Sequence, residues 1–282
     1  MKSLFISVYM MLLMLAPIHA SYFIISDFSY VWIVVLAATL PMLIFFLSIN
    51  MTPYFSTYNL NLTPLYVWEV ATAILLLAVG YLTGHWLVGI YYGIGVTLIG
   101  SGLYIYWYSK LERGSNNILK VGARLPNFEL KDIEGQSVSF RQAFEGITLI
   151  VFYRGNWCPI CMAQIKRLAE NAKEFREREV DVVLVSPQPP SYTFALAKKL
   201  KVPFYFLVDE ENKVAQQLKI SSKEGMPKGI ELLGYDSETV YPTVILTDND
   251  GQIFYVDLTD NYRERPEPVS FIDEIDRHYA IS

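Results

Sequence analysis

The sequence predicts two unlike parts joined end to end: an all-α membrane region of four (or three) transmembrane helices, followed by an α/β three-layer sandwich. Of the 23 Lys and Arg and the 28 Asp and Glu residues, only Lys2, Asp27 and Glu69 precede position 110. Charged residues make up 18% of the chain, against about 25% in a typical soluble protein, and the deficit lies in the front part. In the back part, strand-like and helix-like patterns alternate, which is typical of an α/β domain.

The composition excludes several classes of protein. Hydrophobic residues make up 52% of the chain and aromatic residues 15%, which excludes intrinsic disorder. Two cysteines are too few to build a disulfide-held secreted scaffold. The net charge is −5 and neither part has an excess of basic residues, so we expect no nucleic-acid partner.

Four stretches with almost no charge predict the transmembrane helices: residues 4–25, 31–49, 65–83 and 86–108. About 20 residues are needed to cross the hydrocarbon core of a bilayer, and the last three stretches meet that length. The first stretch, with Lys2 before it and the small residue Ala20 within it, has features of a signal peptide as well as of a span. We favour an uncleaved span, because the apolar pattern continues past Ala20 to Ile25.

Basic residues near the ends of the spans determine the expected orientation. Lys2 precedes the first span, and four basic residues follow the last one: Lys110, Arg113, Lys120 and Arg124. Both ends therefore favour the cytoplasm, which four spans satisfy. We expect a multi-pass integral membrane protein, in the inner membrane of the cell if the source is bacterial, with lipid as a partner and the back domain on the cytoplasmic side.

Two features within the spans predict how the helices pack. Only Gly84 and His85 separate the third and fourth spans, and the spacing of the small residues Gly80, Gly84, Gly89 and Gly93 favours close packing within one chain over a dimer interface. Glu69 is the single acid of these spans. Because it lies about one turn from the start of its stretch, we expect its side chain to reach the membrane interface.

The composition also predicts the boundaries of the domains. Residues 1–110 form the membrane region, residues 111–121 a polar linker and residues 122–282 the α/β domain, whose element order implies parallel strands followed by an antiparallel pair. Its strands are expected at residues 147–153, 180–185, 204–208, 243–247 and 252–256, and its helices at residues 158–178, 191–199, 212–218 and 268–279. Ser191 is expected to cap the second helix, and Asn249-Asp250-Gly251 predicts a hairpin between the last two strands.

Both cysteines of the chain lie at the first strand–helix junction of the α/β domain, in Trp157-Cys158-Pro159-Ile160-Cys161. If they are redox-active, residues 122–282 are a redox domain. Thiols three positions apart at the start of a helix share one face and are close enough to form a disulfide. The free N–H groups of the helix favour the thiolate of Cys158, so we expect Cys158 to be the nucleophile and Cys161 the resolving thiol.

Two other interpretations of this pair remain at this stage. A zinc site is disfavoured, because no second cysteine pair exists and His278 is the only histidine of this domain. Two unreactive buried cysteines are also disfavoured. We therefore expect a redox-active dithiol, with no metal and no cofactor.

These motifs resemble a known family. The Trp-Cys-Pro-Ile-Cys string after an apolar strand resembles the thioredoxin superfamily, and residues 122–128, 152–161 and 262–268 resemble more specifically its peroxiredoxin-like AhpC/TSA (redoxin) branch. The resemblance covers about residues 120–280 and implies a thioredoxin-like fold. It also implies that Pro242, in Val240-Tyr241-Pro242-Thr243, is the cis-proline that receives the backbone of a substrate disulfide.

The chain departs from the pattern of the peroxidases in this family. In their motif, Cys161 falls at the position of the peroxide-reactive cysteine, Cys158 at that of a Thr, and Arg154 at that of a Pro. The arginine that polarises the peroxide is replaced around Tyr241-Pro242. The implied peroxide site is therefore incomplete, whereas the dithiol and the proline are both present.

The incomplete peroxide site and the complete dithiol, together with the apolar front part, predict a membrane-anchored thiol–disulfide oxidoreductase. Cys158 attacks a protein or small-molecule disulfide, Cys161 resolves the intermediate, and Trp157 shields the site. Arg154 either holds the thiolate or is a solvated residue at the strand end. The alternative enzyme is a membrane-tethered peroxiredoxin-like thiol peroxidase, an antioxidant that acts on hydroperoxides. A metallochaperone or binding module on the same fold, and a membrane scaffold, are further alternatives, and the electron donor is left open.

Overall fold

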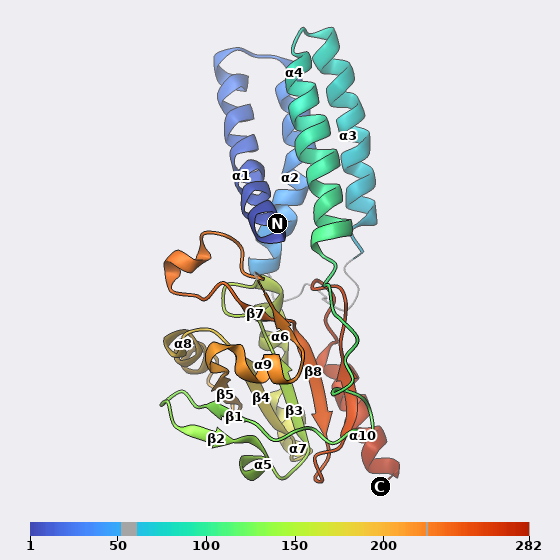
Figure 1. Cartoon of the computed structure of the whole chain (residues 1–282). Helices are drawn as coiled ribbons and strands as arrows, with labels where there is room; N and C mark the ends of the chain where they lie inside the picture. The colour runs from blue at the N-terminus through green and yellow to red at the C-terminus, as the bar shows by residue number, and fades with distance from the viewer. Residues whose placement is uncertain (52–60, 224, 282) are drawn as a thin grey trace. The chain divides into compact units, whose positions relative to one another are not determined.

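The computed structural model describes residues 1–51, 61–223 and 225–281, which fall into two compact units (Figure 1). The first unit comprises residues 1–51 and 61–110, and the second comprises the described residues from Leu111 onward. The first unit contains helices α1 (Lys2–Ser26), α2 (Tyr30–Met51) and α3 (Thr63–Leu82), and a fourth helical segment, Trp86–Tyr108. All four are long and apolar enough to cross a membrane, as the sequence predicted. Helix α1 continues past Ala20 to Ser26.

The fourth segment begins as α4 (Trp86–Val88) and continues as the π-helices η1 (Gly89–Ser101) and η2 (Tyr104–Tyr108). It packs closely against α3. A Cβ atom added to Gly89 would lie 2.8 Å from the Leu76 carbonyl oxygen, and one added to Gly93 would lie 3.2 Å from that of Ala73. The small residues therefore allow two helices of one chain to approach each other, as predicted.

The prediction for Glu69 is wrong, because this side chain is buried within the first unit at 1% exposure. Helix α3 begins at Thr63, so Glu69 lies nearly two turns inside it rather than one. Glu69, Ala73 and Leu76 share one buried face of the helix, since they are four and three positions apart. The helix face, and not the distance from the membrane surface, determines where this carboxyl group lies.

The second unit is built on a seven-stranded mixed sheet in the order β2-β1-β5-β4-β3-β8-β9 (Figure 1). Its strands are β1 (Glu129–Lys131), β2 (Ser137–Ser139), β3 (Thr148–Phe152), β4 (Asp181–Ser186), β5 (Tyr205–Val208), β8 (Thr243–Thr247) and β9 (Ile253–Asp257). Strands β3, β4 and β5 are parallel, and β8 and β9 form an antiparallel hairpin beside β3. Both features were predicted. The hairpin β1–β2 and the small pair of β6 (Ser221–Ser222) and β7 (Thr239–Val240) were not.

The helices of the second unit are α5 (Phe140–Ala143), α6 (Pro159–Glu170), α7 (Ala172–Glu177), α8 (Pro190–Leu200), α9 (Lys213–Gln217) and α10 (Pro268–Ile281), with short 3₁₀ segments η3 (Glu210–Asn212) and η4 (Ile230–Leu233). Two predictions need correction. The single helix expected at residues 158–178 is divided at Asn171, whose ψ of 14° interrupts the helical path. Ser191 does not cap α8, because the helix begins one residue earlier at Pro190 and the cap position is Pro189.

Alternate residues of the central strands face opposite layers. Ile150, Val183 and Ile245 belong to a core that includes Leu218, which follows α9, and Leu119 near the start of the unit. On the other face, the ring of Phe271 in α10 lies 5.9 Å from the ring of Tyr255 in β9. The sheet is therefore covered on both faces, which gives the predicted three-layer sandwich.

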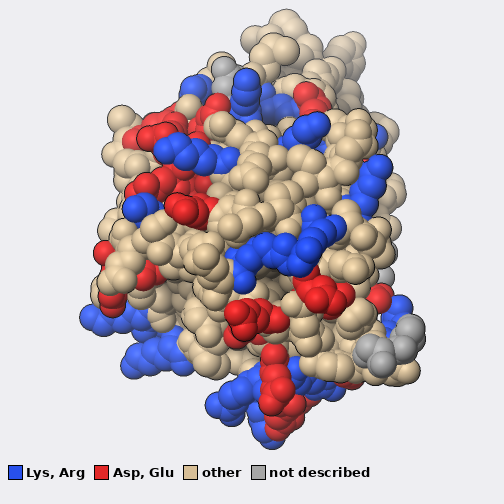
Figure 2. All heavy atoms as spheres, turned by 60° about the horizontal axis from the view of Figure 1, so that its bottom comes forward, with Lys and Arg blue, Asp and Glu red and all other residues tan. Residues whose placement is uncertain are grey.

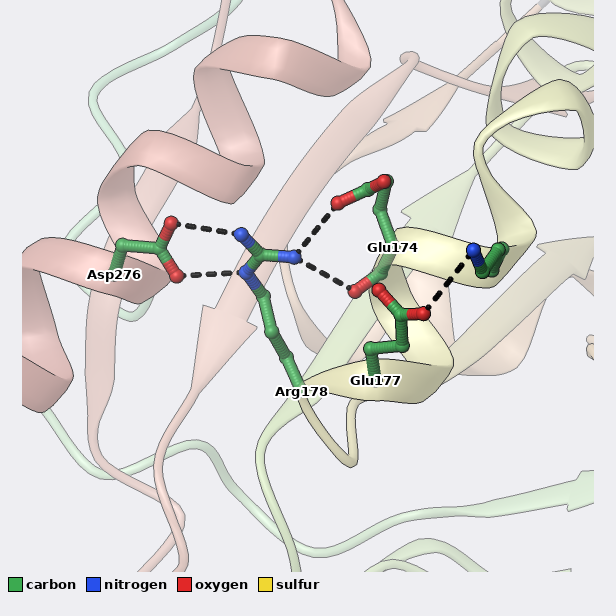
Figure 3. Close-up of polar contacts among 5 residues, drawn as sticks. Glu174, Glu177, Arg178 and Asp276 are labelled. Carbon is green, nitrogen blue, oxygen red and sulfur yellow. Dashed lines mark hydrogen bonds and ion pairs between the residues drawn. The ribbon is translucent and has the colours of Figure 1, made fainter.

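The end of α7 is tied to α10 by a network of charges (Figure 3). Arg178 donates through Nε and a second nitrogen to the two carboxylate oxygens of Asp276, at 2.7 and 3.0 Å, and through the third nitrogen to Glu174. On the face of the protein shown in Figure 2, basic and acidic side chains are interspersed. This is the pattern of a solvated, mixed-charge surface.

Candidate active site

The two cysteines lie where the central strand β3 leads into α6. All five residues of β3 are buried, and Cys158 occupies the cap position of α6, where its carbonyl accepts from the Met162 N–H at 3.0 Å. Cys158 and Cys161 are free thiols, each 1% exposed. Both cysteines therefore lie at the carboxyl ends of the parallel strands, where α/β folds commonly have their binding and active sites.

A glycine makes the turn before the dithiol possible. Gly155 has a φ of 143°, which side chains rarely adopt. A Cβ atom at this position would lie 2.8 Å from Cδ1 and from Nε1 of the Trp157 ring. The indole of Trp157 can therefore fold back over the loop only because residue 155 has no side chain.

Gln188 organises the loop from the neighbouring strand. Its side-chain oxygen accepts from the Asn156 N–H at 2.8 Å, and its amide nitrogen donates to the Tyr153 hydroxyl at 3.0 Å and to Thr193. The sequence analysis did not identify Gln188. Its signal was its position just after the strand that pairs with β3, in Ser186-Pro187-Gln188.

The pKa values of the two thiols are shifted in opposite directions. The pKa of Cys158 is lowered to about 6, mainly because the Cys161 thiol donates to it, with contributions from the charges of Arg154 and Arg265 and from the backbone N–H of Cys161. Burial and the neighbouring Cys158 raise the pKa of Cys161. The Cys161 N–H is one of the free donors of the first helical turn, so part of the stabilisation has the predicted origin.

Arg154 is buried beside the dithiol, at 7% exposure, and is not a solvated residue at the strand end. Its guanidinium carbon lies 4.6 Å from the ring centre of Trp157 and 5.7 Å from that of Tyr262, and the group donates to the Gly225 carbonyl. The charge is therefore held close to the thiols by cation–π and hydrogen-bonding contacts.

Pro242 shares this edge of the sheet, but the expected cis bond is absent. Thr243 pairs with Phe152 across the β3–β8 ladder, which places Pro242 one residue beyond the end of β3. No cis peptide bond occurs among the described residues. Tyr241 and Pro242 join β7 to β8.

The peptide of Pro242 is engaged by a residue that sequence reasoning did not select. Arg113 donates to the Pro242 carbonyl, to the Thr243 hydroxyl at 3.1 Å and to the Thr259 carbonyl at 2.7 Å. Its guanidinium also lies 5.1 Å from the ring centre of Tyr241. Burial lowers the pKa of Arg113 to about 10. The backbone here is therefore already hydrogen-bonded by a partly buried arginine.

Part of the chain is similar to known proteins. Residues 121–256 match the model of the AhpC/TSA family. The chain is 28% identical over 140 residues to Peroxiredoxin Bcp of Escherichia coli (strain K12), covering 50% of this chain and 86% of that protein. It is 35% identical over 102 residues to the chloroplastic Peroxiredoxin Q of Sedum lineare, covering 36% of this chain and 54% of that protein.

Among solved structures, the chain resembles peroxidoxin BcpB from Mycobacterium tuberculosis, with 20% sequence identity and a TM-score of 0.46, over 58% of this chain and 99% of that one. It also resembles a peroxiredoxin-like protein from Aquifex aeolicus, with 17% identity and a TM-score of 0.48, over 58% of this chain and 89% of that one. The region that matches the family contains both cysteines, and the four apolar helices lie outside it.

Proposed function

Because residues 121–256 of this chain belong to the AhpC/TSA family, in the redoxin branch of the thioredoxin superfamily, and the protein is accordingly an oxidoreductase, we propose that it is a membrane-anchored thiol peroxidase. The observation that carries the proposal is the pair of buried thiols with opposite pKa shifts. Cys158 is the thiolate that attacks the hydroperoxide, and Cys161 is the thiol that resolves the product.

The reaction proceeds in two steps. The Cys158 thiolate attacks the terminal oxygen of the hydroperoxide; a sulfur–oxygen bond forms, the oxygen–oxygen bond breaks, and the alkoxide leaves with a proton from solvent. Cys161 then loses its proton and displaces the hydroxyl group from the Cys158 sulfenic acid, which releases water and forms a disulfide. Two electrons from an external dithiol restore the two thiols.

The alternative function, disulfide exchange with a protein substrate, was placed first by the sequence analysis. The CxxC spacing at a helix start still favours it. The structure supports it less, because both sulfur atoms are almost fully buried and the trans Pro242 peptide is occupied by Arg113. A small hydroperoxide reaches a buried thiolate more easily than a folded protein disulfide does.

Two serine variants of the full chain in detergent distinguish the functions. After exposure to hydroperoxide and a sulfenic-acid probe, Cys161→Ser should carry the label on Cys158, while Cys158→Ser should remain almost unlabelled. Rapid labelling of Cys161 in Cys158→Ser would instead assign attack to Cys161, as in the aligned peroxidase motif. If hydroperoxide labels neither variant and Cys161→Ser traps proteins from a membrane extract as mixed disulfides, the function is disulfide exchange.

We further propose that the redox domain faces the cytoplasm. The support is the basic character of both ends of the helical region, with Lys2 before it and Lys110 and Arg113 after it. In sealed inverted and right-side-out membrane vesicles, a membrane-impermeant maleimide should label Cys158 only in the inverted set. Labelling in right-side-out vesicles that equals labelling in permeabilised vesicles would reject this orientation.

A further inference from the structure

A second buried arginine lies beside the dithiol, and neither the sequence motif nor the proposed reaction assigns it a role. Arg265 is 1% exposed and is among the largest fully buried side chains. One of its terminal nitrogens donates to the Asn261 carbonyl at 3.3 Å and also to that of Glu264. Its Nε and its other terminal nitrogen are buried with no hydrogen-bond partner among the described residues.

Such an arrangement is costly for a purely structural arginine. A buried guanidinium normally has all its donors satisfied or is paired with a carboxylate. The acid that interacts electrostatically with Arg265 is Asp257 in β9, whose Oδ1 accepts from the Thr259 N–H while its Oδ2 has no partner among the described residues. Arg265 is therefore not in a direct salt bridge with Asp257, and its charge needs another counterpart.

The topology brings this charge to the thiols. Val244 in β8 pairs with Asp257, and the adjacent Thr243 pairs with Phe152, so this end of β9 and the end of β3 share one edge of the sheet. The Tyr262 ring, three residues before Arg265, contacts the Arg154 guanidinium. The loop that carries Arg265 is thereby held against the loop that carries the cysteines.

We propose that Arg265 is a positioning residue of the dithiol, a fixed buried cation that keeps negative charge on the Cys158 sulfur. The inference rests on the proposed function in one respect only, namely that Cys158 is the attacking thiolate. Arg265 supplies a cation in a chain whose sequence lacks the arginine that the peroxidase motif has near the position of Tyr241-Pro242. The positive charge comes from the loop before α10 instead of from the start of β8.

The charges around the site agree with this assignment. Both thiols interact electrostatically with Arg265, and this interaction lowers the pKa of each. Arg154 and Arg113 add positive charge, and Asp257 supplies the opposing negative charge. Asp257 and Arg265 also line a cavity of about 480 Å³ whose other charged residues are Glu264, Asp273, Glu274 and Arg277. A thiolate at Cys158 offsets part of the positive charge of the buried Arg154 and Arg265 and of the partly buried Arg113.

The test is the pH dependence of Cys158 alkylation in the full chain, followed by peptide mass spectrometry. In Arg265→Gln the midpoint should rise by about one pH unit or more, since one nearby opposite charge is lost. Arg265→Lys should retain most of the effect. The control is Arg277→Gln, which alters the same cavity from its exposed side and should leave the midpoint unchanged.

A second readout separates positioning from a structural role. Oxidation of Arg265→Gln by hydroperoxide should be slow below pH 7 and should approach the wild-type rate as pH rises, because the thiolate then forms without help. An unchanged alkylation midpoint in folded Arg265→Gln, or loss of folding in both variants, would overturn the proposal. If the alkylation midpoint of Cys158 is low in the wild type and rises in Arg265→Gln, but hydroperoxide does not oxidise the wild type, the peroxidase function is rejected and the role of Arg265 stands.

Discussion

At the scale of single residues, two identical side chains three positions apart acquire different chemistry from their surroundings. Cys158 accepts hydrogen bonds from the Cys161 thiol and N–H and interacts with two arginines, whereas Cys161 is the donor, and its burial and the neighbouring Cys158 raise its pKa. Burial alone would raise both pKa values. The order of the two cysteines along α6 decides which one loses its proton.

The lowered pKa predicts a pH profile. Because the pKa of Cys158 is about 6, its thiolate should predominate above that pH, and the rate of alkylation should rise through pH 6 and then level off. Cys161, whose pKa is raised, should react slowly throughout this range. Iodoacetamide alkylation from pH 4 to 9, resolved by peptide, gives both profiles. A midpoint near pH 8.5 for both thiols contradicts the assigned roles.

Gly155 offers a second prediction at this scale. Gly155→Ala forces a side chain into a φ of 143° and against the Trp157 ring, so we expect a loss of about 1–3 kcal/mol of stability. Gly114→Ala is the matched control, because a Cβ atom there meets nothing within 4 Å. Thermal unfolding of the purified proteins should separate the two. Equal stability would show that the loop relaxes without cost.

At the scale of elements, the break at Asn171 gives the second unit a short helix that needs tethering. Helix α7 has six residues, fewer than an isolated helix needs to be stable. Its end is held by the bidentate contact of Arg178 with Asp276, and the Tyr279 hydroxyl donates to the Arg178 carbonyl at 3.1 Å. The long helix α10 therefore holds the short one in place.

Loss of this tether should have a measurable but modest effect. The Arg178 side chain is 25% exposed and that of Asp276 is 51% exposed, so solvent screens the pair. We expect Arg178→Gln to cost about 0.5–1 kcal/mol. Lys173→Gln, which removes the exposed pair with Glu177, should cost about 0.3 kcal/mol or less. Chemical denaturation in low and high salt tests this, and an effect independent of salt would argue against an electrostatic origin.

At the scale of the whole molecule, the two units differ in what surrounds their polar groups. In the first, Glu69 is the one acid of helix α3 and is enclosed by apolar helices. In the second, the buried charges of Arg154 and Arg265 and the partly buried charge of Asp257 gather at one edge of a sheet. Residues 111–121, expected to be a linker, pack on the second unit, where Leu119 is 1% exposed.

This packing predicts where the redox domain can be separated. A fragment of residues 111–282 should fold and retain the reaction of Cys158. A fragment of residues 122–282 lacks Leu119 and the Arg113 contacts with Pro242, and should lose about 2–5 kcal/mol of stability from the cavity left by Leu119 alone. Unfolding curves of the two fragments provide the comparison. Equal stability would mean that residues 111–121 contribute nothing to the core.

Local patterns in the sequence determined much of this protein. The absence of charge from residues 28–68 and 70–109 predicts apolar helices of the kind that span a membrane. The run of residues 147–153 predicts a strand buried on both faces. Asn249-Asp250-Gly251 specifies its hairpin because these residues tolerate the turn geometry. The CxxC at a helix start predicts a dithiol with one favoured thiolate. Each of these effects acts over a few residues.

Only the tertiary structure decided which distant groups meet at the dithiol. Gln188, Arg113 and Arg265 are far apart in the chain, yet strand pairing places them around one edge of the sheet. The trans bond at Pro242 depends on how β7 continues into β8, and the burial of Glu69 depends on the helices packed against its face. No local pattern encodes such contacts, because pairing and packing depend on the whole chain. They add the burial and the neighbouring arginines that act on the pKa values of the two thiols, beyond the effect of the helix start that the sequence predicts.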